Sequence, residues 1–182
     1  MNTIKINGKL VVSDPVYAEL TWCTADLEVL KGEYNCFFEE DEYGDVIVSW
    51  IAHKDYHISP YDISEQIDVL IGVDSGAVGY FNYDYFLEKT SQEEDIINIL
   101  YKQDEEGKYN NGGIANINAF VTHTQCGDGS YECYVKRNKK NQIIAVKVNL
   151  SSYFDNDEDD EYYDEDDEWT TPTKPKGFEE AS

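Results

Sequence analysis

Short runs of β-branched, aromatic and aliphatic residues, each ended by turn-forming residues, dominate the first 150 positions of the chain. Runs of this length and composition are typical of β-strands. Asn7-Gly8, the strongest short signal for a two-residue hairpin, separates the first two runs. The run at 67–73 is nearly continuous and predicts a buried central strand. The predicted strands occupy residues 3–6, 9–12, 34–38, 46–52, 67–73, 130–135 and 143–150.

One segment has the periodicity of a helix. Ser91 and Glu94 form a capping box, and the aliphatic residues that follow at 96–100 supply an apolar stripe. Two shorter segments, residues 25–30 and 83–88, are further helix candidates. The whole pattern predicts a mainly β (α+β) fold, a compact antiparallel β-sandwich-like domain with one or two short helices.

Charge divides the chain into two parts. Of its 182 residues 38 are acidic and 14 basic, which gives a net charge of -24. Residues 155–182 contain 13 acidic and 2 basic side chains, and 11 of these acids fall between residues 155 and 168. Like charges at this density repel, and the segment has no aliphatic periodicity to bury. We therefore predict a β-rich globular domain over residues 1–153 and a flexible, disordered acidic tail over residues 154–182.

The acidic balance excludes several functions. A pI near 4.2 disfavours direct binding to nucleic acid and to anionic membranes. An acidic tail that guards a basic single-strand groove is also disfavoured, because residues 1–154 hold only 12 basic against 25 acidic side chains. No apolar run approaches a membrane span, and residues 1–12 lack the apolar core of a signal peptide. These features predict a cytoplasmic protein.

The cysteines and histidines do not form a metal-binding pattern. Cys23, Cys36, Cys126 and Cys133 include no C-x-x-C pair, and His53, His57 and His123 do not complete a zinc site. We predict neither a metal nor a cofactor and interpret the cysteines as free thiols. A nucleophile pair of Cys126 and His123 stays an open alternative, although nothing in the sequence requires it.

Two glycine-rich turns carry the candidate chemistry of the domain. The segment 71–80 runs from an apolar strand into a tight turn at Asp74, and residues 125–131 form a second turn around Asp128. The favoured interpretation is structural, with glycines supplying positive φ. If the turns packed together, Asp74, Asp128 and His123 would converge as candidate catalytic groups or cation ligands.

Three segments carry a family resemblance. Residues 9–15 (KLVVSDP), residues 71–81 (IGVDSGAVGYF) and residues 127–150, which begin GDGSYECYV, resemble in order the motifs of an uncharacterised bacterial and tailed-phage family of unknown function (DUF 4241-like). The resemblance implies a compact β-rich domain and a phage or prophage origin, and it implies no activity. The acidic tail departs from the family, many of whose members end in a basic or neutral segment.

The first functional hypothesis is a non-enzymatic acidic interaction protein. Acids at almost every position of an extended tail approach the charge density of duplex DNA, which suggests a nucleic-acid-mimicking decoy. In a phage setting the partner would be a basic host protein that binds nucleic acid, such as a defence nuclease, and the protein would act as its inhibitor in the host cytoplasm. The candidate binding residues, with Tyr162, Tyr163 and Trp169 as aromatic anchors, are Asp155, Asp157, Glu158, Asp159, Asp160, Glu161, Tyr162, Tyr163, Asp164, Glu165, Asp166, Asp167, Glu168 and Trp169.

Two alternatives stay open. The first is a domain that binds or hydrolyses a small ligand such as a nucleotide signal through Asp74 and Asp128, although Arg137, the single arginine, offers the only bidentate phosphate grip. In the second, the tail only solubilises the domain or lies on its own basic segment at residues 136–140. The sequence does not indicate the oligomeric state.

Overall fold

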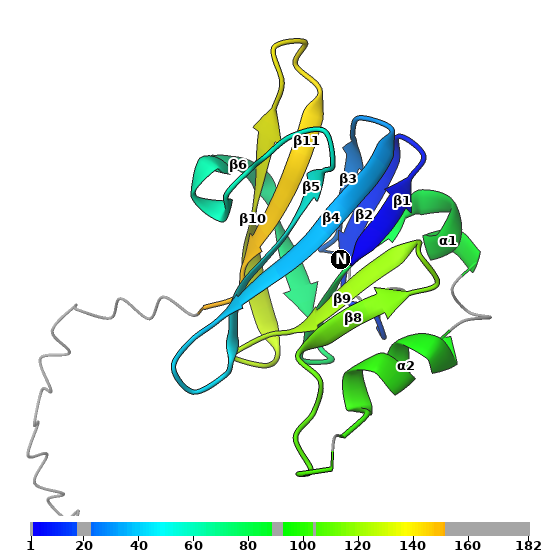
Figure 1. The fold of residues 1–182 in the computed structure, drawn as a ribbon, viewed down its shortest axis with the longest axis vertical. Helices are drawn as coiled ribbons and strands as arrows, with labels where there is room; N and C mark the ends of the chain where they lie inside the picture. The colour runs from blue at the N-terminus through cyan, green and yellow to red at the C-terminus, as the bar shows by residue number, and fades with distance from the viewer. Residues whose placement is uncertain (1, 18–22, 89–92, 104, 152–182) are drawn as a thin grey trace, which may run out of the picture. The chain divides into compact units, whose positions relative to one another are not determined.

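Two antiparallel sheets account for most of the described chain (Figure 1). The computed structural model describes residues 2–17, 23–88, 93–103 and 105–151. The chain divides into two units, residues 1–152 and residues 153–182. The described strands and helices all belong to the first unit and confirm the predicted mainly β, sandwich-like fold. The predicted tail, residues 154–182, lies outside the described residues.

Sheet A has six strands in the order β1-β4-β5-β11-β10-β6. They are β1 (Thr3–Ile6), β4 (Gly32–Glu40), β5 (Val46–His53), β11 (Ile143–Asn149), β10 (Gly129–Arg137) and β6 (Glu65–Val73). The hairpins β4–β5 and β10–β11 join runs that the sequence predicts as strands.

Sheet B has five strands in the order β3-β2-β7-β9-β8. They are β3 (Ala25–Glu28), β2 (Lys9–Ser13), β7 (Ala77–Asn82), β9 (Ala119–His123) and β8 (Gly112–Ala115). Every residue of β7 is buried, because this strand lies in the middle of the sheet and is covered on both faces.

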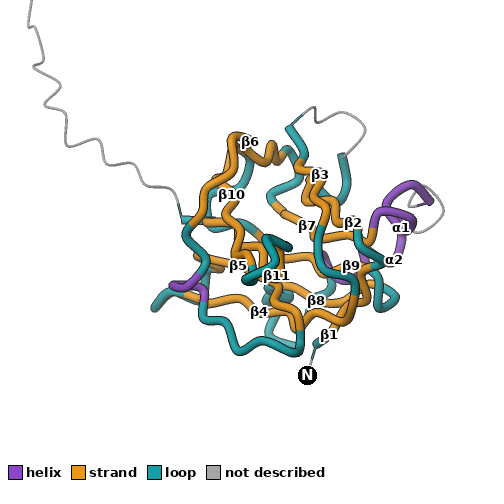
Figure 2. The backbone as a smooth tube through the Cα atoms, turned by 90° about the horizontal axis from the view of Figure 1, so that it is seen from above, coloured by secondary structure: helices purple, strands orange, loops and turns teal. Residues whose placement is uncertain are grey.

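The described helices are short and lie outside the sheets (Figure 2). The helix α2 (Glu93–Tyr101) confirms the predicted amphipathic helix, and α1 (Tyr83–Glu88) confirms one of the two further candidates. Ser91 of the predicted capping box lies outside the described residues. A single 3₁₀ turn, η1 (Pro60–Asp62), lies beside sheet A.

The main core fills the space between the two sheets, around Tyr34, Tyr80 and Phe120, whose side chains are fully buried. The rings of Tyr80 and Phe120 stack with centroids 5.8 Å apart. The Tyr80 hydroxyl crosses from sheet B into sheet A, where it donates to the Ser49 carbonyl at 2.8 Å and accepts from the Val148 N–H at 3.1 Å. The hydroxyl thus contacts backbone groups of both β5 and β11 and ties the two sheets together.

Each sheet also has a covered outer face. On sheet B, Phe81 packs with Tyr85 of α1 and with Ile96 and Leu100 of α2. On sheet A, the segment around η1 covers Trp50 through Ile58 and Ile63. Apolar residues on both faces of the inner strands are therefore buried, which explains why the sequence shows continuous apolar runs as well as alternation.

Backbone contacts join the edges of one sheet to segments of the other. The N–H of Gly72, on edge strand β6, donates to the Cys23 carbonyl just before β3. On the other side, the N–H of Lys5 in β1 donates to the carbonyl of Ile117 in the β8–β9 turn. Such contacts shorten the exposed strand edges, which would otherwise be open to pairing with another chain.

The hairpin predicted at Asn7-Gly8 is wrong. β1 pairs with β4 in sheet A, whereas β2 pairs with β3 and β7 in sheet B. Gly8, at φ 104°, carries the chain from one sheet to the other. The flanking aliphatic residues, such as Ile6 and Leu10, then reach the same core from opposite sides. Burial between sheets outweighs the local turn preference.

Two further expectations need correction. Residues 67–73 do not form a central strand, because β6 is an edge strand on which Val69 and Leu70 are 38% and 45% exposed. Residues 25–30 are not helical but contain β3, where Ala25 and Leu27 point toward the core. A short apolar segment does not by itself distinguish a helix from a strand or an edge from a centre, because its partners come from distant parts of the chain.

Candidate functional site

The first glycine-rich turn is held by a buried carboxylate. Asp14, which follows β2, is fully buried. Its Oδ1 accepts the N–H groups of Val16 at 2.7 Å and Tyr17 at 2.8 Å. Its Oδ2 accepts those of Asp74 at 2.7 Å and Ser75 at 2.8 Å. One side chain therefore fixes the end of β2 against the turn between β6 and β7.

The second glycine-rich turn lies against the first. The N–H of Thr124 donates to the Gly76 carbonyl at 2.9 Å, and a Cβ placed on Gly76 would be 3.7 Å from the Gly127 Cα. Gly76 and Gly127 have φ values of 66° and 74°, so glycine supplies positive φ in both turns, as predicted. Hydroxyls of Thr124 and Tyr131 each donate to the Gly127 carbonyl at 2.7 Å and order the second turn.

The candidate groups on these turns point to different surroundings. Asp74 and Asp128 are both exposed, although the backbones of their turns meet. The His123 Nε2 lies 2.8 Å from the Leu100 carbonyl at the end of α2. Among the described residues there is no group of three or more His, Cys, Asp or Glu side chains placed to hold a metal ion. The two turns therefore meet through glycines and backbone groups, not through side chains that could bind a cation together.

An aromatic cluster lies beside the two turns. The ring of Tyr101 lies 6.4 Å from that of Tyr109 and 6.2 Å from that of His123. The Tyr101 hydroxyl donates to the Ser75 carbonyl at 3.5 Å. Partial burial, and then nearby groups that include Asp128, raise the pKa of Tyr101, so this phenol stays protonated and is not a base at neutral pH.

The structure places both members of the alternative nucleophile pair, Cys126 and His123, in different surroundings. Cys126 is exposed in the second turn, while His123 faces the end of α2. Cys36 and Cys133 are buried, and burial raises the pKa of the Cys133 thiol to about 12. A buried thiol of this kind is a small apolar side chain rather than a nucleophile.

The difference among the cysteines makes a measurable prediction. We expect Cys126 to react with an aromatic disulfide reagent within seconds at pH 8, whereas Cys36 and Cys133 react only on unfolding. Raising a thiol pKa from 9.0 to about 12 lowers its thiolate fraction by about a thousandfold. Cys126→Ser removes the fast phase. A native protein in which the two buried thiols react as fast as Cys126 contradicts this placement.

The most acidic described segment is the tip of the β4–β5 hairpin, which we call the acidic hairpin. Its acids are Glu39, Glu40, Asp41, Glu42 and Asp45. The N–H groups of Leu150 and Ser151 both donate to the Ile47 carbonyl at 2.9 Å, so the described chain ends beside this hairpin. The Lys108 ammonium lies near Gly44 and supplies a local positive charge.

The β10–β11 hairpin lies at the opposite end of sheet A and carries the main group of positive charges. We call residues 136–142 the basic hairpin, and its cations are Lys136, Arg137, Lys139 and Lys140. In Figure 1 the basic hairpin is at the top and the acidic hairpin is at the bottom. β11, with seven residues, separates the two ends by about 20 Å.

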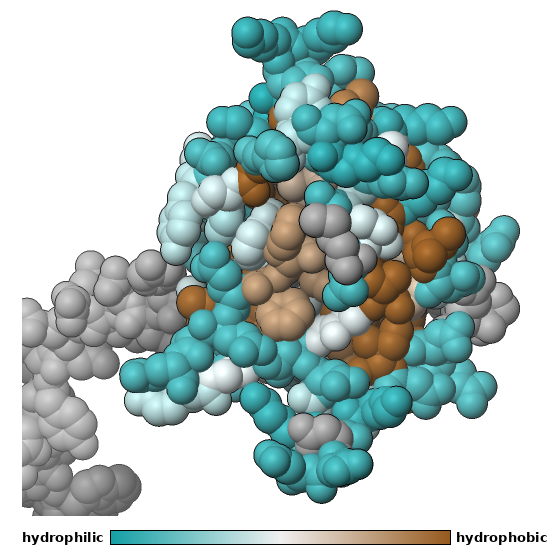
Figure 3. Space-filling view, in the orientation of Figure 1, coloured by the Kyte–Doolittle hydropathy of each residue, from teal (hydrophilic) through white to brown (hydrophobic). Residues whose placement is uncertain are grey.

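The surface between the two hairpins is less polar. Figure 3 shows hydrophilic side chains at both hairpin tips and apolar surface over the middle of this face, toward β8 and β9. Phe38 and Ile114 are partly buried members of the adjoining core. The two hairpins thus place opposite charges at the two ends of sheet A.

Sequence reasoning missed two features of the site. From the sequence, Asp14 belongs to the segment 9–15 that carries the family resemblance, and no local pattern indicates that its carboxylate is a buried acceptor. The basic charges at residues 136–140 were recognised as a segment on which the tail could lie, but their place at the opposite end of sheet A from the acidic hairpin was not. The candidate binding residues 155–169 lie outside the described residues.

Comparison with known proteins does not assign the chain to a family. No family model, curated protein or solved structure matches the chain. Within the described residues, none of the helices has the length and apolar character needed to cross a bilayer. Function must therefore be argued from charge and geometry alone.

Proposed function

We propose that this chain is a non-enzymatic acidic interaction protein that binds a basic host protein by imitating nucleic acid. The partner would be a protein that uses lysine and arginine to hold phosphates, such as a defence nuclease, and binding would block that surface. The proposed location is the host cytoplasm, and the proposed origin is a phage or prophage. The origin follows the motif resemblance and is independent of the binding argument.

The observation that carries the proposal is the continuity of negative charge along the sequence and at the end of the described domain. The acidic hairpin places five acids next to Ile47, and Ser151 is bonded to that same residue. Eleven more acids follow between residues 155 and 168. Sixteen acids thus belong either to the hairpin beside Ser151 or to the segment that follows it.

The magnitude of this charge supports competition with nucleic acid. Duplex DNA carries one charge per ~1.7 Å, and an extended chain advances ~3.3 Å per residue. Eleven acids in 14 residues therefore give about one charge per 4 Å, which is close to the spacing along one DNA strand. A basic channel that releases counterions when it binds DNA gains the same entropy from such a segment.

A small-ligand function at Asp74 and Asp128 has less support. Both side chains are exposed, and the backbone of Asp74 serves to bind Asp14. Substitution of both by Asn tests this alternative, because a ligand site there would lose binding without loss of stability. The solubilising-tail alternative is tested directly by the following experiment.

The experiment compares three baits in pulldowns from a bacterial host lysate, analysed by mass spectrometry. The baits are the full chain, a variant whose 11 acids at 155–168 are replaced by Asn and Gln, and a variant neutralised in the acidic hairpin alone. We expect the full chain to retain a basic nucleic-acid-binding protein that duplex DNA displaces. The tail variant should lose at least about tenfold of this binding, and the hairpin variant should lose less.

The tail variant keeps the length and the aromatic residues of the tail, so it separates charge from bulk. Equal capture of the same basic protein by the full chain and the tail variant would contradict the proposal. Capture that duplex DNA does not displace would contradict the mimicry and leave only a general acidic contact. Loss of solubility without loss of binding would favour the solubilising role.

A further inference from the structure

A hollow of about 510 Å³ opens beside the basic hairpin. Its apolar floor contains Leu30, Tyr56 and Ile144, and its rim contains Arg137, Lys139 and Lys140. Ligand pockets commonly range from about 300 to 1,000 Å³ and combine an apolar lining with a few polar groups. This hollow, which we call the basic hollow, has that size and that division into floor and rim.

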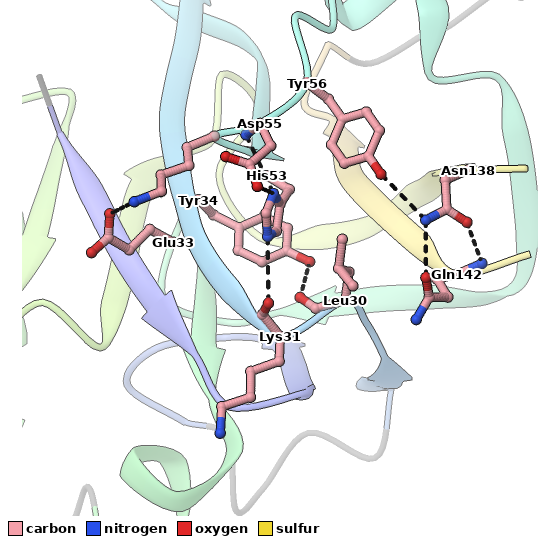
Figure 4. Close-up of polar contacts among 10 residues, drawn as sticks. Leu30, Lys31, Glu33, Tyr34, His53, Asp55, Tyr56, Asn138 and Gln142 are labelled. Carbon is pink, nitrogen blue, oxygen red and sulfur yellow. Dashed lines mark hydrogen bonds and ion pairs between the residues drawn. The ribbon is translucent and has the colours of Figure 1, made fainter. Parts of the chain in front are cut away.

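The rim is held in place by the loop itself. The Asn138 side chain accepts the N–H groups of Lys140 at 2.9 Å and Gln142 at 3.0 Å. Its amide nitrogen donates to the Gln142 Oε1 at 3.0 Å and to the Tyr56 hydroxyl at 3.4 Å (Figure 4). One side chain therefore fixes the turn and joins the rim to the floor. A fixed rim loses little entropy on binding.

Arg137 is oriented by its neighbours, but part of its guanidinium can still donate hydrogen bonds to a ligand. Its Nε donates to Glu65 at 2.9 Å, and its Nη1 donates to the Asn141 carbonyl at 3.2 Å. A guanidinium has five N–H donors, and these two contacts leave the Nη2 side for a ligand. Glu65 thus acts as a positioning residue that also offsets part of the Arg137 charge.

The floor is anchored from behind. Leu30 donates its N–H to the Ile143 carbonyl at 2.8 Å, and its own carbonyl accepts the Tyr34 hydroxyl at 2.6 Å. The His53 ring, which is 5% exposed, lies edge-on to the rings of both Tyr34 and Tyr56. Figure 4 shows this group of residues beside Asn138 and Gln142 of the hairpin. The hollow is therefore built on ordered side chains.

Two of the three rim cations lie outside the ion pairs of the described residues. Lys9, Lys54 and Arg137 each form an ion pair with a carboxylate. The ion pairs among the described residues include neither Lys139 nor Lys140. In a chain with 38 acids and 14 bases, two adjacent lysines outside these pairs leave a local positive potential that attracts an anion.

We propose that the basic hollow binds a nucleoside monophosphate. Lys139, Lys140 and the Nη2 side of Arg137 would hold the phosphate. The base would lie over the apolar floor beside Tyr56, within reach of the Gln142 amide. A free phosphate would use only the rim and an uncharged nucleoside only the floor, so a nucleotide matches both parts. This inference does not rest on the proposed function.

The test is a titration of the full, isotope-labelled chain with AMP, GMP, CMP and UMP in turn, followed by backbone amide chemical shifts. We expect at least one nucleotide to shift the amides of Leu30, Lys140, Gln142 and Ile144 with saturation. Inorganic phosphate and the matching nucleoside should each bind at least about tenfold more weakly. Lys139→Gln with Lys140→Gln should weaken nucleotide binding by at least about tenfold.

The matched control is Lys102→Gln with Lys108→Gln, which removes the same charge away from the hollow, Lys108 lying near Gly44 of the acidic hairpin, and should leave the affinity within about twofold. The spectra themselves report whether each variant is folded. The proposal is overturned if none of the four nucleotides shifts these amides, if phosphate or nucleoside alone binds equally well, or if both double variants behave alike. Shifts confined to the turns at Asp74 and Asp128 also overturn it. Partner capture by the tail would be unaffected by any of these results.

Discussion

Asp14→Asn is expected to lower the free energy of unfolding by about 2–4 kcal/mol. The two carboxylate oxygens of Asp14 accept four backbone N–H groups, two from the segment after β2 and two from the turn at Asp74 and Ser75. An asparagine has one acceptor oxygen and a donor NH₂ group. Two buried N–H groups would lose their acceptor and face a donor, at roughly 1–3 kcal/mol each.

Urea unfolding followed by circular dichroism measures this change. The control is Asp26→Asn on β3, which removes the same charge from an exposed carboxylate whose partner is Lys9 at 3.7 Å. An exposed pair of this kind is worth less than about 1 kcal/mol. A loss for Asp14→Asn no greater than that for Asp26→Asn would show that the carboxylate does not hold the two segments together.

Tyr80→Phe is expected to cost about 1–3 kcal/mol, although it removes only one oxygen atom. The Tyr80 hydroxyl is fully buried between β5 and β11, where it bonds the Ser49 carbonyl and the Val148 N–H. It also lies 2.9 Å from the Ser49 hydroxyl. Removal takes these buried contacts away from backbone groups of both strands. The apolar ring of phenylalanine fills the rest of the space.

The same unfolding experiment applies, with Tyr43→Phe as the matched control because Tyr43 is 81% exposed. Surface substitutions of this kind change stability by less than about 0.5 kcal/mol. Ser49→Ala should weaken the same group of contacts by less than Tyr80→Phe, since the Ser49 carbonyl and the Val148 N–H keep their partner. Equal stability of Tyr80→Phe and the wild type would mean that the hydroxyl does not join the sheets.

The sequence was most informative where partners are close along the chain. The β4–β5 and β10–β11 hairpins follow from strand runs separated by polar turns, and α2 follows from its apolar spacing. In each case the residues that pack together lie within a few tens of positions. Local propensity and tertiary packing then favour the same structure.

The errors arise where the partner is distant. Asn7-Gly8 has the composition of a hairpin turn, yet Ile6 pairs with Gly32 and Leu10 pairs with Asn82. No local sequence pattern indicates that two consecutive strands belong to different sheets. The edge position of β6 has the same origin, because it depends on β10, more than fifty residues away.

The candidate site was predictable only in part. The positive φ of Gly76 and Gly127 follows from composition, and their contact was raised as a condition for a site. Asp14 was not recognised, since its four donors come from two segments about sixty residues apart. The basic hollow depends on Leu30 and Tyr56 meeting the β10–β11 turn, which the sequence does not indicate.

The central claim is that clustered negative charge gives this chain its partner. The most direct measurement is the affinity of the captured basic protein for the full chain and for the variant with neutral residues at 155–168, at two salt concentrations and with duplex DNA as competitor. We predict that DNA and the full chain exclude each other, and that the neutral variant binds at least about tenfold more weakly with a smaller salt dependence. Equal affinity of the two chains, or a ternary complex with DNA, would contradict the account.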